Sequence, residues 1–429
     1  MARVGPGEQL SLKLIEARPE GREETSRPGT ARPRQYAICN PVMLRWLRER
    51  VNLTPAAAAK RLGTKEENLL AWEDETSPKR PTIPQLRRAA KLYKRPLAAF
   101  YFPEPPTTYS LPKDTRRLPD IEPGEFSTGL LLAFRLAEFR RDVALSLDSN
   151  PPPAEFVGTA SLDGDPEELA AIGREELGVT PAEQYSWRDP RRYKPLNGWK
   201  NALESLAVLV FHYTGVEVEE VRGFSIPKRP YPVIAVNGSD TQNGRIFTLA
   251  HEFGHLLLGD SAACDLEDYT RLGSPDVPVE TFCNRFAGAL LVPADDLLAT
   301  EAVASVTSAT DWDEQVLAEL ALSFGVSREV VLRRLVILGR ADEDFYRARR
   351  RDLLTLPVRE AVDRKGRPSF VQMVVRNVGK PYARLVVDAY RADAITGADV
   401  VDYLGAKLKH LPRIERQLTG KDTLTGALP

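Results

Sequence analysis

Cysteine, histidine and long apolar runs are all scarce in this sequence of 429 residues. The three cysteines, Cys39, Cys264 and Cys283, are too few and odd in number to form a disulfide framework. Such a composition is typical of a reducing compartment, so we expect a cytoplasmic protein. No run approaches about 18 uninterrupted apolar residues, and the N-terminus lacks the apolar segment of a secretory signal. We therefore predict no transmembrane helix, no secretion and no membrane partner.

An excess of charge of either sign is also missing. Lysine and arginine number 59 against 60 aspartate and glutamate residues, which gives a formal net charge of -1. This balance offers no overall electrostatic argument for nucleic-acid binding, although it can conceal local patches of one sign. Apolar residues make up 42% of the chain, and its length allows two or three domains with cores of their own.

The sequence does contain a pair of histidines at metal-ligand spacing. His251 and His255 bracket Glu252 within an apolar stretch, and the chain has only four histidines in all. On an α-helix these two positions lie one turn apart on the same face, so both imidazoles can reach one zinc ion. Glu252 lies beside them, where it is placed to act as general base on a zinc-activated water. The alternative is a buried helix whose two histidines are satisfied by hydrogen bonds.

A catalytic zinc site needs a third protein ligand, and a second helical stretch offers one. The pattern predicts a helix over residues 279–293, on which Glu280 and Asn284 lie one turn apart. Glu280 is the expected third ligand, and Asn284 is placed to hydrogen-bond the ring of the first histidine. Cys283 is the rival ligand on the same helix. His212 ends an apolar run, and we expect it in the core instead of at a metal.

Two blocks of the sequence resemble the ImmA/IrrE family of bacterial metallo-endopeptidases. The first block is Arg245–His255 and the second is Glu280–Pro293, and they occur in the family's order at a plausible separation. The resemblance implies a zinc peptidase of gluzincin type, with both histidines and Glu280 as ligands and Glu252 as the base. It also implies a regulatory protein as substrate, such as a transcriptional repressor or an antitoxin, and a link to transcriptional control or stress response.

Residues 36–102 carry a dense helical pattern with two short helices around a glycine. Thr54, followed by Pro55, caps the first helix, Gly63 ends it, and Thr64 is expected to cap the second. Two short helices joined in this way are typical of a helix-turn-helix. The stretch resembles the phage-repressor-like (Xre) class of such domains.

The helix-turn-helix interpretation predicts DNA binding by the second helix. The residues at the start of that recognition helix are then Thr64, Lys65 and Asn68. Local charge favours this function, because residues 41–102 hold 13 lysines and arginines against 6 acidic residues. However, Glu66 and Glu67 stand where base-reading residues are expected, and they would repel phosphates. The alternative is a helical module used for dimerisation or substrate docking.

Composition divides the remaining chain. We predict a flexible arm at 1–35, the helix-turn-helix domain at 36–102, a proline-rich linker at 103–125, a zinc metallopeptidase domain at 126–300 and a C-terminal helical region with a β-hairpin at 301–429. The fold class is α+β and mainly helical, with a gluzincin-like peptidase domain.

Two further features concern the substrate. Pro230–Gly238 is typical of a strand just before the metal helix, and in zinc peptidases of this type a sheet edge pairs with the extended substrate. The sequence leaves open which strand forms that edge. Tyr269 and Arg271, between the two ligand blocks, are candidates for stabilising an oxyanion.

Beyond residue 300, residues 312–324 and 328–338 predict a helix pair. We interpret the pair as a buttress for the catalytic helices, and the alternative is a second helix-turn-helix that exposes Arg333 and Arg334. Alternating polar and apolar residues between 370 and 388 predict the β-hairpin.

Together these patterns predict a zinc-dependent endopeptidase acting on a protein substrate, with DNA as a further partner through the N-terminal domain. Two alternatives belong to other classes. One is a DNA-binding transcriptional regulator whose peptidase-like domain acts as a ligand sensor. The other is an interaction module with a structural zinc ion.

Overall fold

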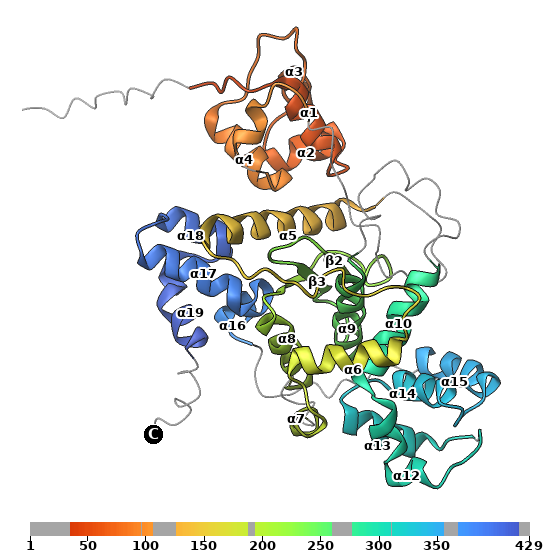
Figure 1. Cartoon of the computed structure of the whole chain (residues 1–429). Coiled ribbons are helices and arrows are strands. Elements are labelled where there is room, and N and C mark those ends of the chain that lie inside the picture. The colour runs from red at the N-terminus through yellow and green to blue at the C-terminus, as the bar shows by residue number, and fades with distance from the viewer. Residues whose placement is uncertain are drawn as a thin grey trace, which may run out of the picture.

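The computed structural model describes the chain at residues 35–95, 97–105, 126–187, 194–259, 277–309, 311–355 and 368–419. This part is mainly helical and contains one three-stranded sheet, in agreement with the predicted α+β class. None of its helices is long and apolar enough to cross a membrane. A small N-terminal domain lies next to a larger body (Figure 1). Nearly all of the predicted arm and most of the predicted linker lie outside the described residues.

The N-terminal domain consists of short helices around a core of its own. They are α1 (Pro41–Glu49), α2 (Pro55–Leu62), α3 (Glu66–Trp72), α4 (Ile83–Tyr93) and the 3-10 helix η1 (Leu97–Tyr101). Thr54 and Thr82 cap α2 and α4 with their side-chain oxygens, as predicted. The predicted cap at Thr64 is wrong, because its N–H completes the end of α2 and α3 begins after Lys65. The helix-turn-helix assignment of α2 and α3 stays a prediction.

The body is built around a small sheet with the strand order β1-β3-β2. Strand β1 (Leu209–Tyr213) runs parallel to β3 (Val233–Asn237), and β2 (Gly223–Ile226) pairs with β3 in the antiparallel direction. The predicted strand at 230–238 corresponds to β3. All three strands are buried, since helices cover both faces of the sheet.

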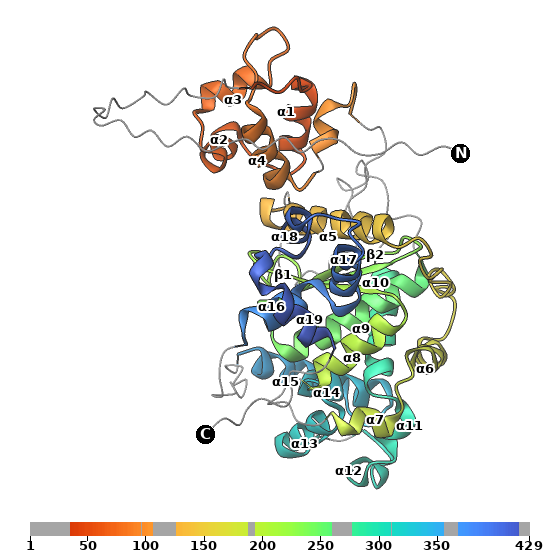
Figure 2. The same cartoon turned by 90° about the vertical axis from the view of Figure 1, so that its left-hand side faces the viewer.

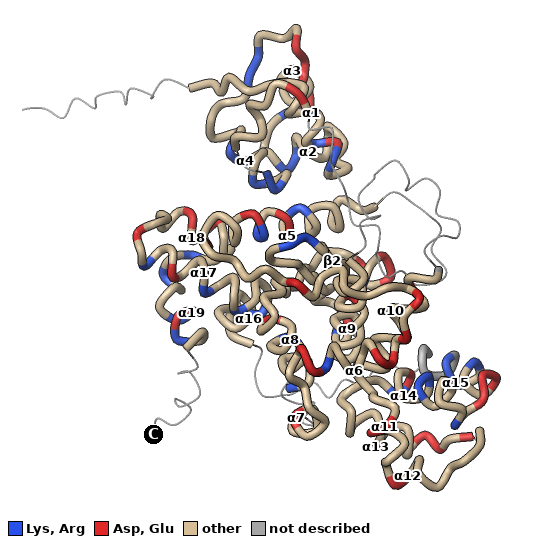
Figure 3. Tube along the Cα trace, viewed as in Figure 1, with Lys and Arg blue, Asp and Glu red and all other residues tan. Residues whose placement is uncertain are grey.

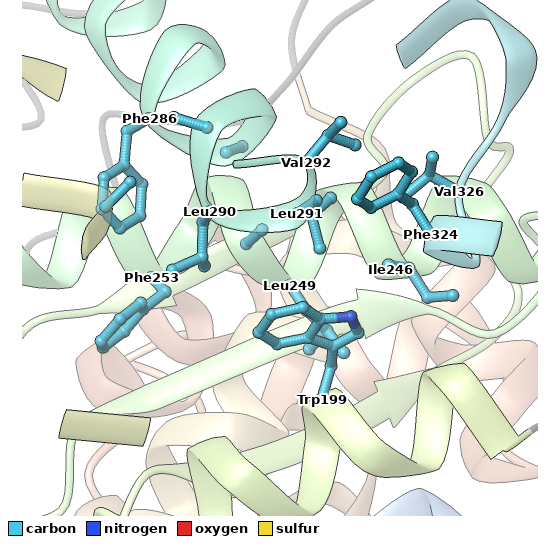
Figure 4. Close-up of a cluster of buried hydrophobic side chains, with 14 of the residues drawn as sticks. Trp199, Ile246, Leu249, Phe253, Phe286, Leu290, Leu291, Val292, Phe324 and Val326 are labelled. Atoms are coloured by element: carbon cyan, nitrogen blue, oxygen red, sulfur yellow. The ribbon is translucent and has the colours of Figure 1, made fainter. Parts of the chain in front are cut away.

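One face of the sheet packs against the helices that carry the predicted metal ligands. These helices and their neighbours are α6 (Pro166–Leu177), α7 (Pro181–Ser186), α8 (Lys194–Ser205), α9 (Gln242–Leu258), α10 (Val277–Leu291), α11 (Ala294–Leu298), α12 (Glu301–Ala304), α13 (Glu314–Phe324), α14 (Arg328–Ile337) and α15 (Glu343–Thr355). Figure 4 shows part of their shared core, with Trp199 from α8, Phe253 from α9 and Phe286 from α10. Because α13 and α14 belong to this core, the boundary predicted after residue 300 runs through it.

The arginines of α14 are held within the body. Arg334 is buried and pairs with Glu167 of α6, and Arg333 pairs with Glu343 of α15 at 2.8 Å. Both guanidinium groups are therefore engaged by carboxylates instead of being presented to a nucleic acid. This arrangement favours a buttress over a second helix-turn-helix.

The other face of the sheet packs against helices from two distant parts of the chain. They are α5 (Thr128–Leu147), α16 (Phe370–Val378), α17 (Lys380–Arg391), α18 (Gly397–Leu404), η4 (Leu408–His410) and α19 (Leu411–Leu418). Figure 2 shows the C-terminal helices beside the sheet and below α5.

The predicted C-terminal β-hairpin is wrong, because helices α16 and α17 occupy its place. Ser369 and Gln372 form a capping box that starts α16. The buried residues of α16 recur with the helical period, and they are Val371, Val374, Val375 and Val378. Valines at helical spacing also produce a partly alternating sequence, so the segment follows the helical period and not the two-residue period of a strand.

Candidate metal centre

Helix α9 places the two histidines at the centre of the body. Its N-terminus is capped by Thr241, whose hydroxyl oxygen accepts from the N–H of Gly244 at 3.0 Å. Its C-terminus ends at Gly259, whose backbone is left-handed with φ of 55°. A Cβ on Gly259 would stand only 2.2 Å from the Cα of Gly158, so only glycine allows these two chain segments to meet. Residues 248–257 between the two ends are all buried.

Helix α10 crosses α9 at a second close approach. A Cβ on Gly254 would lie 3.0 Å from the Phe286 ring and 3.3 Å from the sulfur of Cys283. The missing side chain at residue 254 therefore lets α10 lie directly on α9. This contact brings Glu280, near the start of α10, to the two histidine rings.

Three potential ligand atoms converge at this crossing. The Nε2 atoms of His251 and His255 lie 3.1 Å apart. The carboxylate of Glu280 lies 3.3 Å from Nε2 of His251 and 3.8 Å from Nε2 of His255. One ligand atom from each residue lies within 4.8 Å of the others.

These separations fit a metal ion. Tetrahedral bonds of 2.0–2.1 Å to zinc place neighbouring ligand atoms roughly 3.3 Å apart, close to the distances at this crossing. Both imidazoles are buried, whereas the Glu280 side chain is 31% exposed, so the group is open to solvent on the glutamate side. Two imidazoles and one carboxylate are the donor types that zinc accepts, and they leave a fourth position free for a substrate or water.

Glu252 lies fully buried next to His251 on the same helix. Its neighbour across the site is Gly223, the first residue of β2, at which a Cβ would stand 3.5 Å from Oε1 of Glu252. The same Cβ would be 2.3 Å from the Cγ2 of Thr248, so only glycine fits between β2 and α9. Burial and the charge of Glu252 raise the pKa of the Tyr213 hydroxyl on β1. Together with Glu280, Glu252 supplies the negative charge that favours a cation here.

The connection between β2 and β3 is held by Arg141 of α5. Its Nε donates to the carbonyl of Tyr231 at 3.0 Å, and its Nη2 lies within bonding distance of the carbonyls of Lys228, Arg229 and Pro230. One guanidinium therefore fixes four consecutive carbonyl groups, and with them the position of the strand beside Glu252.

The remaining predicted residues lie away from the group. Cys283 is buried against Gly254, and Asn284 is exposed without a hydrogen bond to either histidine in the described part of the chain, so its role stays a prediction. His212 is buried in β1, where burial and the nearby Lys200 and Arg245 hold its pKa well below the usual value. It is a neutral core histidine, as expected.

Tyr269 and Arg271, the predicted oxyanion candidates, lie outside the described residues. Gly223 and Arg141 were not predicted from the sequence, because a lone glycine at the start of a four-residue strand and an arginine in an amphipathic helix carry no distinctive local pattern.

Comparison with known proteins bears on the part of the chain that holds this site. No curated protein matches the chain. The family model of the IrrE N-terminal-like domain matches residues 204–336, which span the sheet, α9, α10 and nearly all of α14. Residues 204–336 are therefore similar to the IrrE N-terminal-like domain, and this matched stretch contains the group of His251, His255 and Glu280.

Proposed function

We propose that the protein is a zinc-dependent endopeptidase of gluzincin type that cleaves a regulatory protein, such as a repressor or an antitoxin. The observation that carries this proposal is the convergence of His251, His255 and Glu280 beside the buried Glu252. Cleavage of a regulator would couple the enzyme to transcriptional control or stress response. The scarcity of cysteine supports a cytoplasmic location.

Each residue of the site has a defined task in this proposal. His251 and His255 hold the ion through Nε2, and Glu280 holds it through its carboxylate. When bound, zinc polarises the scissile carbonyl and lowers the pKa of water to roughly 7. Glu252 accepts a proton at its carboxylate and delivers it to the nitrogen of the leaving amine. The buried surroundings of α9 exclude other water from this transfer.

Strand β2 is the edge that we propose for the substrate. It has β3 on one side, and no further strand pairs with it in the described residues. The outer edge of β1 is occupied instead, because a Cβ on Gly379 would stand 2.9 Å from the carbonyl oxygen of Val210. Since Gly223 of β2 lies beside Glu252, an extended substrate paired with β2 would pass over the metal group.

The test is to compare the cellular proteins cleaved by the wild-type chain and by the Glu252→Gln variant. We expect the variant to keep one zinc ion per chain and to lose cleavage by a factor of about 10² to 10⁴. Glu301→Gln changes an exposed glutamate far from the site in sequence and serves as the matched control. Equal cleavage by the Glu252 and Glu301 variants would refute the peptidase and leave a sensor or a structural zinc site.

A further inference from the structure

The N-terminal domain carries a group of exposed cations, most of which have no partner of opposite charge among the described residues. Lys60 and Arg61 end α2, and Arg87 and Arg88 lie on α4. All four side chains are exposed, and none of them forms an ion pair or hydrogen bond within the described part of the chain. Lys91, one turn after Arg87, extends the same stripe of α4. We refer to these five residues as the basic surface.

The two helices bring these charges together. Helices α2 and α4 are in contact, and Nη1 of Arg88 lies 3.4 Å from the position that a Cβ of Gly63 would take, directly after α2. Like charges gathered without carboxylates repel one another, and a polyanion relieves that repulsion. A row of phosphates is the ligand that best fits several exposed arginines and lysines, because arginine binds phosphate oxygens with two N–H groups.

Helix α3, the predicted recognition helix, has the opposite character. It exposes Glu66 and Glu67 in its first turn, followed by Leu70 at 47% exposure. Acidic and apolar side chains do not bind phosphates. Figure 3 shows positive charge gathered on the side of the domain with α2 and α4, and acidic residues at α3 on the side away from α5.

One end of the basic surface, at Lys91, also faces the body. Lys91 pairs with Asp402 of α18 at 2.8 Å, and Arg95, just after α4, lies 3.6 Å from Glu138 of α5. Figures 1 and 2 both place α4 between the rest of the N-terminal domain and α5. While Lys91 is bonded to α18, a duplex cannot use this end of α4.

The docked arrangement rests on contacts of unequal burial. Arg95 and Glu138 are only 18% and 15% exposed, and Leu132 of α5 packs against the N-terminal core. Lys91 and Asp402 are 67% and 47% exposed, and such exposed pairs add little stability. Asn52 adds two hydrogen bonds, to the backbone of Phe126 and from the hydroxyl of Thr128. The Lys91–Asp402 pair is therefore open to competition by a ligand of the same charge as Asp402.

We propose that the basic surface binds the phosphate backbone of duplex nucleic acid, and that this binding competes with docking of the N-terminal domain on α5 and α18. Nucleic acid then selects the undocked arrangement of the chain. By linkage, a change on the body side that weakens docking tightens nucleic-acid binding, by at most the factor by which docking is weakened. The proposal is independent of peptidase activity.

The experiment uses the full chain and a fluorescent duplex DNA of mixed sequence, with anisotropy measured over a range of salt concentrations. The double variant Arg87→Glu and Arg88→Glu should bind at least tenfold more weakly, and its slope of log affinity against log salt should fall by about 2. Asp402→Lys should bind several-fold more tightly than the wild type and show a larger radius of gyration without DNA.

Asn68→Ala, at the start of α3, is the matched control and should bind within twofold of the wild type. Loss of binding in the Asn68 variant with normal binding in the Arg87 and Arg88 variant would overturn the proposal in favour of recognition by α3. Absence of DNA binding by both the wild type and the Asp402 variant would also overturn it. So would binding to vesicles containing phosphatidylserine in place of duplex DNA. Circular dichroism checks that each variant is folded.

Discussion

Helices α9 and α10 of the body and helices α2 to α4 of the N-terminal domain use polar side chains in opposite ways. In the body, His251, His255 and Glu252 are buried, and the two histidines converge with Glu280 on one site, so the fold fixes their geometry. In the N-terminal domain the charged side chains are exposed and spread over a surface, as Lys60 and Arg87 illustrate. Burial therefore turns residue spacing into a defined geometry, whereas an exposed surface acts through its summed charge.

The largest effect should come from removing one ligand of the buried group. We expect His251→Ala to lose zinc and all cleavage. Zinc at 100 times its dissociation constant should raise the free energy of unfolding of the wild type by about 2.7 kcal/mol. Zinc should leave the free energy of unfolding of the variant unchanged. Calorimetry with and without zinc measures the difference. His410→Ala, a histidine outside the group, should behave as the wild type, and an equal loss in both variants would contradict the assignment.

The next effect tests how tightly the fold fixes the site. A methyl group at residue 223 would stand 2.3 Å from Thr248 and 3.5 Å from Glu252, so β2 or α9 must shift in Gly223→Ala. We expect activity to fall about 100-fold, as for a misplacement of roughly 1 Å, and stability to fall by about 1–3 kcal/mol. Ser225→Ala on the same strand adds no atoms and is the control. Wild-type cleavage by the Gly223 variant would show that the geometry is not so constrained.

A smaller effect should appear in the pH dependence of stability. Burial lowers the pKa of His212 in the folded chain, so the unfolded chain binds more protons below pH 6.5. Stability contributed by the neutral ring is present above this pH and is lost as the pH falls toward the folded pKa. The slope is at most about 1.4 kcal/mol per pH unit. The measurement is the free energy of unfolding in urea between about pH 7.5 and pH 5, the range in which histidine titrates. It should depend less on pH in His212→Leu than in the wild type. Parallel profiles would argue against a neutral buried ring.

The smallest effect belongs to the exposed surface. A double-mutant cycle of Lys91→Ala and Asp402→Ala should give a coupling of about 0.2–1 kcal/mol that disappears at high salt. Thermal unfolding at two salt concentrations measures this coupling. A value that persists in salt would mean that the two domains are joined more rigidly than an exposed ion pair allows.

The three residues of the candidate metal group could be predicted because the signal is a helical period within an apolar stretch. The i and i+4 spacing of His251 and His255 can be read from the sequence. Glu280 was the expected third ligand because it lies one helical turn from Asn284 on the second predicted helix. What brings Glu280 to the histidines is the contact of Gly254 with α10. That contact joins residues from two separate helices, so it had to be seen in three dimensions.

The errors in prediction have local causes. At residues 370–388, valines at helical spacing also satisfy part of an alternating pattern, and the capping box at Ser369 was the signal that favours a helix. For Thr64 the sequence does not decide between two roles. Its N–H can bond a carbonyl at the end of α2, as the structure shows, or its hydroxyl can cap the start of α3. The fold class survived both errors because it depends on long helices and on the buried strands.

Anomalous X-ray diffraction at the zinc edge, on crystals of the full chain grown with zinc, tests the central claim most directly. We predict one zinc ion at about 2.0–2.2 Å from Nε2 of His251, Nε2 of His255 and a carboxylate oxygen of Glu280. A zinc ion bound elsewhere, or a Glu280 carboxylate turned away from an ion held by the two histidines alone, would contradict it.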